Sequence, residues 1–194
     1  MSIVFTISEA FGSGKSSVVN LVCKLLDGLD LAIPYTTRTP HIANNQDRGF
    51  VFTSREVFEL MIAREEFLEY VSILGNYYGT PSHYLQQARE NGKDLLAQVD
   101  DSGAAQIKQK IPDAVSILVL PGPSAQGRHV FGPDANPSMP SLLQEVLRPS
   151  LQEVLSQSQM PNPEKYDQVI VNDRLEEAAN RLSEIIRSER LRRS

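Results

Sequence analysis

Residues 2–17 read Ser-Ile-Val-Phe-Thr-Ile-Ser-Glu-Ala-Phe-Gly-Ser-Gly-Lys-Ser-Ser, and this stretch decides the fold. Its first part, residues 2–7, is a short apolar run rich in β-branched side chains, which is typical of a strand buried on both faces. A glycine-rich turn follows, and from Lys15 onward apolar residues recur at helical spacing until Gly28. The stretch therefore predicts a buried strand, a glycine-rich loop and a helix in direct succession.

Similar units follow further along the chain. Strand-like apolar runs occupy residues 94–99, 114–120 and 168–171. A helix is expected over about residues 102–110, and a final helix is expected to bury an apolar face made of Leu175, Ala178, Ala179, Leu182, Ile185 and Ile186. Strands and helices that alternate in this way predict an α/β fold in which helices cover both faces of a parallel sheet.

Residues 35–80 have a different pattern. They contain Phe50-Val51-Phe52, then a helix that opens at Thr53-Ser54-Arg55-Glu56, then two further apolar stretches. Thr53 and Glu56 have the spacing of a capping box, in which a hydroxyl and a carboxylate satisfy backbone N–H groups at the start of a helix. We interpret residues 35–80 as a small α+β insertion on the parallel core.

Composition limits the classes of protein that fit this chain. It has 194 residues, enough for one domain with an appended flap. With 19 basic and 24 acidic residues the net charge is −5, which argues against general binding to nucleic acid or to an anionic membrane. Cys23 is the only cysteine, so no intramolecular disulfide can form. The N-terminus lacks a signal-peptide pattern and no apolar run approaches the roughly 18 residues of a membrane span, so a cytoplasmic location is expected.

The glycine-rich loop has the groups that bind phosphate. Such binding requires unpaired backbone N–H groups at a helix N-terminus, a lysine for the β- and γ-phosphates, and a hydroxyl for Mg²⁺. We therefore expect ATP to bind this loop, with Mg²⁺ held by the hydroxyl of Ser16. The loop residues expected to contact ATP are Gly12, Ser13, Gly14, Lys15, Ser16 and Ser17.

One residue of the loop departs from the full phosphate-binding pattern. That pattern has glycine at the position of Glu9. Two like charges about 4 Å apart repel by roughly 1 kcal/mol in water and by about 4 kcal/mol at an effective dielectric constant of 20. A carboxylate beside polyphosphate therefore predicts weakened ATP affinity. Two other placements stay open: Glu9 pairs with Lys15 in the empty loop, or its side chain points away.

Six further motifs follow the loop. They are Thr36-Thr37-Arg38-Thr39-Pro40, Phe67-Leu68-Glu69-Tyr70, Gly75-Asn76-Tyr77-Tyr78-Gly79-Thr80-Pro81, Gly92-Lys93-Asp94-Leu95-Leu96, Pro112-Asp113-Ala114-Val115-Ser116-Ile117 and Val171-Asn172-Asp173. In order and spacing they resemble the guanylate kinase family over residues 1–120 and 164–194. The resemblance implies a parallel sheet of the P-loop NTPase type and transfer of the γ-phosphoryl group of MgATP to GMP.

The resemblance also divides the chain into three parts. Residues 1–34, 81–120 and 164–194 would form the nucleotide-binding core, residues 35–80 a GMP-binding subdomain, and residues 121–163 a proline-rich, lid-like segment. The expected partners are GMP and ATP, with Mg²⁺, and neither nucleic acid nor a membrane.

Individual residues receive roles from the same resemblance. Glu69 would accept hydrogen bonds from guanine N1 and N2 and Thr80 would contact O6, so that adenine would leave polar groups unpaired. The GMP phosphate would be held by Arg38 and by the hydroxyl of Tyr78. Asp100 would lie near the substrate and the metal ion. The catalytic set implied by the resemblance is Lys15, Arg38 and Arg148, the last on the lid.

Several positions differ from what the family carries. Pro34 replaces a serine, His41 replaces a phosphate-binding arginine, Phe50 replaces a phosphate-binding tyrosine, and Gln98 stands where a carboxylate is usual. A hydrogen bond to a charged group is worth roughly 1.5–3 kcal/mol, so losses at positions 41 and 50 predict a high Michaelis constant for GMP.

The lid-like segment differs most. Eight of the 12 prolines fall within residues 121–163, where Arg128 and Arg148 are the only cations. Phosphoryl transfer depends on positioning and on cations around the migrating group. Because Pro149 breaks any helix beside Arg148, the segment predicts reduced activity.

Two functions therefore fit the sequence. One is a slow guanylate kinase, which the retained Lys15 and Ser16 favour. The alternative is a catalytically deficient guanylate-kinase-like binding module that recognises GMP or a phosphorylated protein partner, which the changes at Glu9, in the lid and among the phosphate ligands favour.

Overall fold

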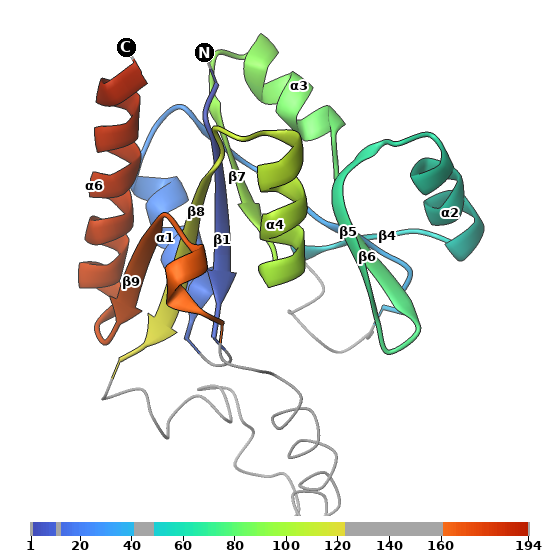
Figure 1. The fold of residues 1–194 in the computed structure, drawn as a ribbon, viewed down its shortest axis with the longest axis horizontal. Helices are drawn as coiled ribbons and strands as arrows, with labels where there is room; N and C mark the ends of the chain where they lie inside the picture. The colour runs from blue at the N-terminus through green and yellow to red at the C-terminus, as the bar shows by residue number, and fades with distance from the viewer. Residues whose placement is uncertain (1, 11–12, 41–48, 123–160, 194) are drawn as a thin grey trace, which may run out of the picture.

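The computed structural model describes residues 2–10, 13–40, 49–122 and 161–193. Its core is a sheet of five parallel strands in the order β2-β7-β1-β8-β9 (Figure 1). The strands are β1 (Val4–Glu9), β2 (Leu29–Leu31), β7 (Asp94–Gln98), β8 (Val115–Pro121) and β9 (Gln168–Asn172). β1 is the central strand and pairs on both sides, and its residues Val4 to Ser8 are all buried.

In the described part of the chain, helices cover both faces of the sheet (Figure 1). α1 (Lys15–Leu25) and α6 (Leu175–Arg193) pack on the face that carries the side chains of Phe5 and Ile7. α3 (His83–Glu90) and α4 (Asp101–Lys110) pack on the opposite face, which carries Val4. Successive side chains of a strand point to opposite faces, so β1 contributes to both hydrophobic clusters. The predicted α/β fold with helices on both faces is confirmed.

The boundaries of the predicted elements differ from the observed ones by only a few residues. β1 begins at Val4 and continues to Glu9, because its pairing with β8 extends as far as Glu9 opposite Val119. Leu25, at helical spacing in the sequence, is 52% exposed, whereas Leu26, the C-cap of α1, is buried in the core. The predicted apolar face of α6 is buried apart from Leu175, which packs against the core and is partly buried.

The insertion forms a second, four-stranded sheet in the order β4-β3-β6-β5. Its elements are β3 (Tyr35–Thr36), β4 (Val51–Phe52), α2 (Arg55–Ala63), β5 (Phe67–Ile73) and β6 (Asn76–Pro81). Phe58 of α2 is fully buried, and its ring stacks on Phe67 and Tyr77 with centroids 4.4 and 5.2 Å apart. These three aromatic rings form the centre of the insertion, which stands beside the core sheet in Figure 1.

The predicted cap of α2 is displaced by one residue. Ser54, and not Thr53, is the N-cap, and its side chain accepts a hydrogen bond from the backbone N–H of Val57. Thr53 instead donates its backbone N–H to the carbonyl of Thr36, which extends the pairing of β3 with β4. Two adjacent hydroxyl residues both fit the local pattern, and strand pairing decides between them.

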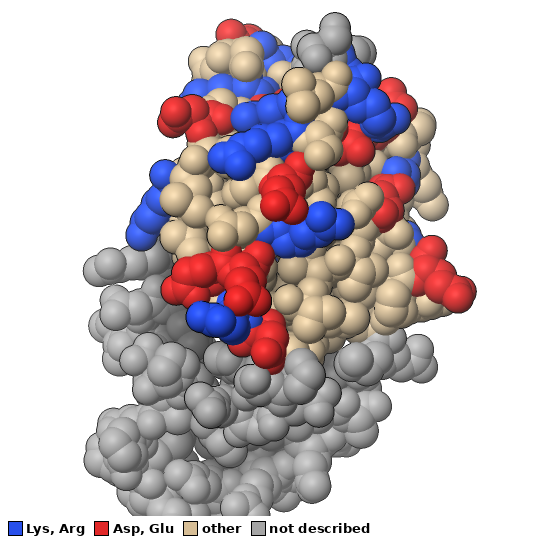
Figure 2. Space-filling model, turned by 90° about the vertical axis from the view of Figure 1, so that its left-hand side faces the viewer, with Lys and Arg blue, Asp and Glu red and all other residues tan. Residues whose placement is uncertain are grey.

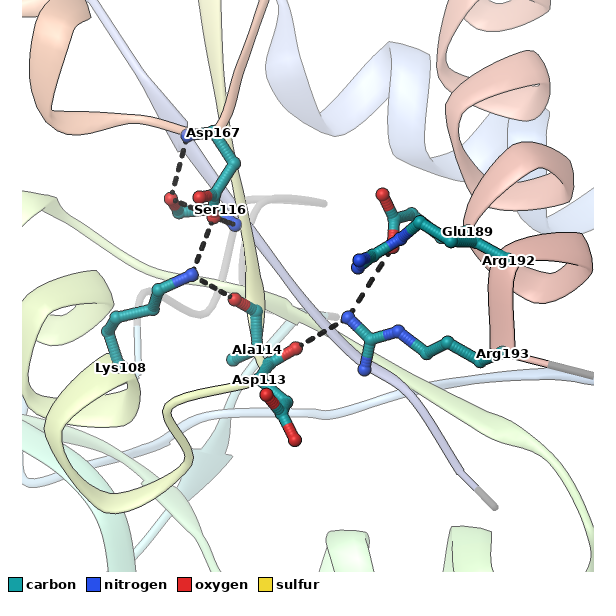
Figure 3. A network of polar contacts seen from close by, with 8 residues as sticks. All are labelled: Lys108, Asp113, Ala114, Ser116, Asp167, Glu189, Arg192 and Arg193. Carbon is teal, nitrogen blue, oxygen red and sulfur yellow. Dashed lines mark hydrogen bonds and ion pairs between the residues drawn. The ribbon is translucent and has the colours of Figure 1, made fainter.

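The C-terminal half of α6 is tied to the edge of the sheet where the strands begin. Arg190 Nε lies 2.7 Å from Asp94 Oδ2, and Arg190 Nη2 donates to the carbonyl of Gly28 at 2.8 Å. Arg193 donates to the carbonyl of Asp113 at 2.8 Å (Figure 3). Figure 2 shows basic and acidic side chains interspersed on this side of the molecule, so the terminal arginines act as local anchors.

A second polar cluster joins α4 to the turn before β9 (Figure 3). The short 3₁₀ helix η3 (Pro163–Lys165) leads into this turn. Lys108 Nζ and the N–H and hydroxyl of Ser116 all lie 2.8 Å from Asp167 Oδ2. Burial opposes ionisation of Asp167, but these hydrogen bonds and the charge of Lys108 outweigh it and lower the pKa of the carboxyl group.

None of the helices in the described part of the chain has the length and apolar character needed to span a lipid bilayer.

The contact between Asp94 and Arg190 gives a test of how α6 is held. Asp94 is buried, and it also accepts the N–H of Ile3 at 2.8 Å, so Asp94→Ala leaves a partly buried arginine without its carboxylate and a backbone N–H without its acceptor. We expect this variant to lower the free energy of unfolding by about 3 kcal/mol. Urea denaturation followed by circular dichroism measures the change.

Asp30→Ala is the control, because it removes the more exposed Lys93–Asp30 pair, whose atoms are 2.7 Å apart. An exposed pair is worth less than about 1 kcal/mol. Equal losses of unfolding free energy in the two variants would contradict a larger contribution from the contacts of Asp94.

Candidate active site

A cleft of about 1070 Å³ lies between the carboxyl edge of the core sheet and the insertion. In open α/β sheets, ligands bind at this edge because the loops that follow the strands gather there. The cleft is lined by five residues to which the sequence assigns roles, and they come from the glycine-rich loop and α1, from β5 and β6, and from the end of β7. They are Lys15, Ser16, Glu69, Tyr78 and Asp100.

The remaining predicted site residues either lie around the cleft or fall outside the residues that the structure describes. Ser13 is buried in the loop, Gly14 precedes α1, and Ser17 is exposed in the first turn of that helix. Thr80 is 1% exposed and lies against Glu69. Gly12, His41 and Arg148 fall outside the described residues.

The donors of the glycine-rich loop converge on one carboxylate. Glu9 Oε2 accepts hydrogen bonds from Ser13 Oγ at 3.0 Å and from the backbone N–H of Lys15 at 3.3 Å. Lys15 Nζ lies 3.5 Å from Glu9 Oε1. Of the placements left open by the sequence, pairing with Lys15 is the one observed. The carboxylate thus occupies an anion-binding arrangement of the kind that binds phosphate, so these residues fit a nucleotide phosphate.

The shape of the loop depends on Gly14 and Asn172. Gly14 has a φ of 74°, a conformation that residues with a side chain rarely adopt. Asn172, at the end of β9, donates its side-chain N–H to the carbonyl of Ser13 at 2.7 Å. A Cβ atom on Gly14 would lie only 2.9 Å from Asn172 Nδ2. The sequence analysis placed Asn172 in a motif but assigned it no role. Its position directly after a predicted strand was the only sequence signal that it belongs to the site.

Oxygen atoms gather where Mg²⁺ is expected. Ser16 Oγ donates to the side-chain carbonyl of Gln98 at 3.1 Å, and both residues line the cleft with Asp100. Asp100 is the N-cap of α4, where its carboxylate accepts the N–H of Gly103 at 2.7 Å. Mg²⁺ prefers hard oxygen ligands, so the donor set fits this ion, with one carboxylate and a neutral amide oxygen.

The guanine side of the cleft is built around a buried carboxylate. Glu69 is 5% exposed, and Thr80 Oγ1 donates to its Oε1 at 2.6 Å. Burial raises the pKa of Glu69, and the nearby charge of Asp100 adds to the rise, although the hydrogen bond from Thr80 opposes it. A buried carboxylate with one side-chain donor retains acceptor capacity for a ligand that brings N–H groups.

The end of the cleft where the GMP phosphate is expected has apolar walls. Pro34 and Phe50 line it, and the ring of Phe50 meets Tyr78 edge-on with centroids 6.0 Å apart. The guanidinium group of Arg38 lies over the rings of Phe50 and Phe52, 5.9 and 5.3 Å from their centroids. Arg38 is therefore placed beside the cleft wall by cation–π contacts.

A second cavity, of about 540 Å³, lies at the opposite edge of the sheet. Its basic residues Arg89, Lys110 and Arg193 each stand in the last turn of a helix. Cations at helix C-termini are favoured by the helix dipole, so these charges need no anionic ligand.

A central parallel strand that leads into a phosphate-binding loop, opposite a smaller sheet with a buried carboxylate, defines a nucleotide-binding protein of the P-loop class. Residues 3–189 match the family model for guanylate kinase. The chain is 39% identical to the guanylate kinase of Koribacter versatilis, over 98% of this chain and 80% of that protein. It is 33% identical to the guanylate kinase of Escherichia coli O157:H7, over 98% of this chain and 90% of that protein.

A solved structure of guanylate kinase from Anaplasma phagocytophilum superimposes with a TM-score of 0.65 at 25% identity, over 97% of this chain and 86% of that one. The chain therefore belongs to the guanylate kinase family. The predicted class of enzyme, a nucleoside monophosphate kinase, is confirmed.

The buried carboxylate of Glu69 predicts a characteristic pH dependence of stability. Its raised pKa means that the folded state favours the protonated form, so this site stabilises the fold at low pH and loses that contribution as pH rises through the folded-state pKa. We expect Glu69→Gln to gain stability relative to the parent as pH rises from about 5 to 8. Urea denaturation at several pH values measures this difference.

Glu90→Gln, at an exposed glutamate of α3, controls for the loss of one negative charge. A difference between Glu69→Gln and the parent that stays constant over this pH range, or that falls as pH rises, would contradict the prediction.

Proposed function

We propose that this chain transfers the γ-phosphoryl group of MgATP to GMP, giving ADP and GDP, at a reduced rate. One observation carries the proposal. The phosphate-type donors around Lys15 and the buried carboxylate of Glu69 line the same cleft, so a phosphate donor and a guanine base would bind facing each other. Residues 35–80 would bind GMP, residues 1–34, 81–120 and 164–194 would bind ATP, and residues 121–163 would form the lid.

In this proposal Glu69 recognises guanine. Its free lone pairs would accept N1–H and the N2 amino group of the base, and adenine would leave them unpaired because its N1 is an acceptor. Thr80 donates its hydroxyl proton to Glu69, so it would hold the carboxylate in the acceptor orientation. Its contact with guanine O6 stays a prediction, because that contact requires the hydroxyl to turn.

The donor phosphates would replace the Glu9 carboxylate in the loop. The backbone N–H of Lys15 and the hydroxyl of Ser13 would then donate to phosphate oxygens, and the ammonium group of Lys15 would balance their charge. Mg²⁺ would be held by Ser16 and Asp100, and when bound it neutralises charge on the phosphates. Catalysis would rest on this positioning, since phosphoryl transfer needs little covalent participation by the protein.

The GMP phosphate would be held by Arg38 and Tyr78. Phe50 has no hydroxyl to donate beside Tyr78, and an apolar wall faces the expected phosphate position. Weak binding of GMP and a high Michaelis constant follow from this loss. The lid arginine Arg148 and a cytoplasmic location remain predictions.

A second candidate function rests on the glycine-rich loop, whose donors are occupied by the carboxylate of Glu9. If Glu9 excludes ATP, the remaining site would bind GMP or a phosphorylated protein partner without turnover. The ion pair of Glu9 with Lys15 is the observation that favours this binding module.

An assay that couples ADP release to a colour change, with GMP and MgATP as substrates, tests the proposal. We expect turnover with GMP, none with AMP, and a high Michaelis constant for GMP. Calorimetric titrations with each nucleotide accompany the assay. Binding of GMP without turnover would select the binding module, and the absence of both binding and turnover would reject both functions.

The role of Glu9 is tested by Glu9→Gly. Removing the carboxylate frees the loop donors and abolishes the repulsion of phosphate. We expect the dissociation constant for MgATP to fall at least about fivefold, which corresponds to the lower limit of about 1 kcal/mol for two charges in water. Isothermal titration calorimetry measures the constant.

Glu9→Gln is the matched control, because it removes the charge and leaves an oxygen that accepts hydrogen bonds from the loop. Its gain in affinity is expected to be smaller. A Glu9→Gly variant that binds MgATP no more tightly than the parent would show that Glu9 does not oppose the nucleotide.

A further inference from the structure

We propose that α4 acts as a clamp on the guanine-recognising strand, with Gln106 and Lys110 as positioning residues that fix Glu69 relative to Asp100. The inference rests on the proposed role of Glu69 in binding guanine. It concerns residues outside the cleft lining, to which the sequence motifs assign no function.

β5 is an edge strand of the second sheet, so within the described residues one side of its backbone has no neighbouring strand. At Tyr70, the side chain of Gln106 occupies this side of the strand. Its Oε1 accepts the backbone N–H of Tyr70 at 3.2 Å, and its Nε2 donates to the carbonyl of Tyr70 at 3.0 Å. A side-chain amide offers one acceptor and one donor in the arrangement of a peptide group, so Gln106 replaces a strand partner at this residue.

Lys110, one helical turn further on, binds the other end of the same segment. Its Nζ donates to the carbonyl of Phe67 at 2.8 Å. Ser102 lies one turn before Gln106, and its hydroxyl oxygen accepts a hydrogen bond from Gln106 Nε2 at 3.3 Å. Residues 102, 106 and 110 therefore form an i, i+4 stripe along α4 that faces the edge of β5.

The bonded backbone groups lie on both sides of Glu69. The pairing of β5 with β6 also shifts register between Phe67 and Glu69, which is the mark of a β-bulge. Bulges re-aim side chains and loosen local pairing. At this bulge, the contacts of α4 with Phe67 and Tyr70 would supply the restraint that the strand ladder lacks.

The first turn of α4 contacts the Glu69 carboxylate itself. A Cβ atom on Gly103 would lie 2.8 Å from Glu69 Oε2, so only glycine leaves room for the carboxylate. The same turn is capped by Asp100, which lines the cleft. One short helix thus begins at the carboxylate expected near the metal ion and holds the strand that carries the guanine acceptor. Its rigidity would set the distance between the two substrate sites.

The cleanest variant is Gln106→Ala, because the residue is uncharged. Gln109→Ala is the matched control: Gln109 is an exposed glutamine on the same helix and makes no hydrogen bond through its side chain within the described part of the chain. We expect Gln106→Ala to raise the dissociation constant for GMP about tenfold, because GMP must then order the strand at a cost comparable to one to two neutral hydrogen bonds, with the constant for MgATP unchanged. Gln106→Glu keeps the acceptor for the Tyr70 N–H but places a second oxygen against the Tyr70 carbonyl, so it should not restore the GMP affinity.

Hydrogen exchange tests the clamp without any nucleotide. The amide of Tyr70 should exchange faster in Gln106→Ala than in the parent, and Gln109→Ala should not change it. Lys110→Met should weaken GMP binding as well, and more strongly in combination with Gln106→Ala.

Several results would overturn the proposal. Unchanged GMP affinity and unchanged Tyr70 exchange in Gln106→Ala would do so, as would equal losses of GMP and MgATP affinity, which indicate a general loss of structure. A parent that binds MgATP but not GMP would instead reject the proposed function, and the exchange result would still decide whether Gln106 holds β5.

Discussion

The pairing of β1 with a strand on each side is the constraint on which the rest of the structure depends. β1 is hydrogen-bonded to β7 and β8 along most of its length, which places it in the middle of the sheet, where its side chains from Val4 to Ser8 are buried on both faces. Even the hydroxyl groups of Thr6 and Ser8 are buried. Burial on both faces requires helices above and below the sheet. It also fixes where the chain leaves the sheet, which is at Glu9, directly before the phosphate-binding loop.

Glu9 and Gln98 together change the electrostatics of that edge. A carboxylate stands at the end of β1, where the full loop pattern has glycine, and a neutral amide stands at the end of β7, where the family resemblance predicts a carboxylate. If the site binds MgATP as proposed, a negative charge would lie on the phosphate side of the cleft and one would be missing from the metal side. A carboxylate near Mg²⁺ attracts the ion, whereas a carboxylate among the loop donors competes with phosphate. In the proposed function both residues would act in the same direction, toward weaker binding of MgATP. In the structure, Glu9 satisfies the donors of the loop.

Short-range patterns predicted the core of this fold well. The apolar run of residues 2–7, the helical spacing after Lys15 and the buried face of α6 follow from periodicities of two and 3.6 residues, which act locally. The cap of α2 was misplaced by one residue, because Thr53 and Ser54 satisfy the same local rule and strand pairing selects Ser54. The contacts of Asn172 with Ser13 and of Gln106 with Tyr70 join residues 159 and 36 positions apart, and no local pattern predicts them. The direction of the Glu9 side chain was left open for the same reason, since it depends on the folded loop.

Burial of Glu69 links the stability of the fold to the choice of base. A carboxylate in a largely buried site costs free energy as long as its lone pairs lack donors, and here Thr80 is the side chain that supplies one. A ligand that brings two N–H groups removes that cost, whereas one that brings an acceptor increases it. In the proposed function, discrimination between bases would therefore arise from a group that destabilises the empty protein. Because Phe50 removes a donor from the phosphate side, base recognition would supply a larger share of the binding energy for GMP in this chain. The position of Glu69, and hence the helix that holds its strand, then matters more than it would in a site with a full set of phosphate ligands.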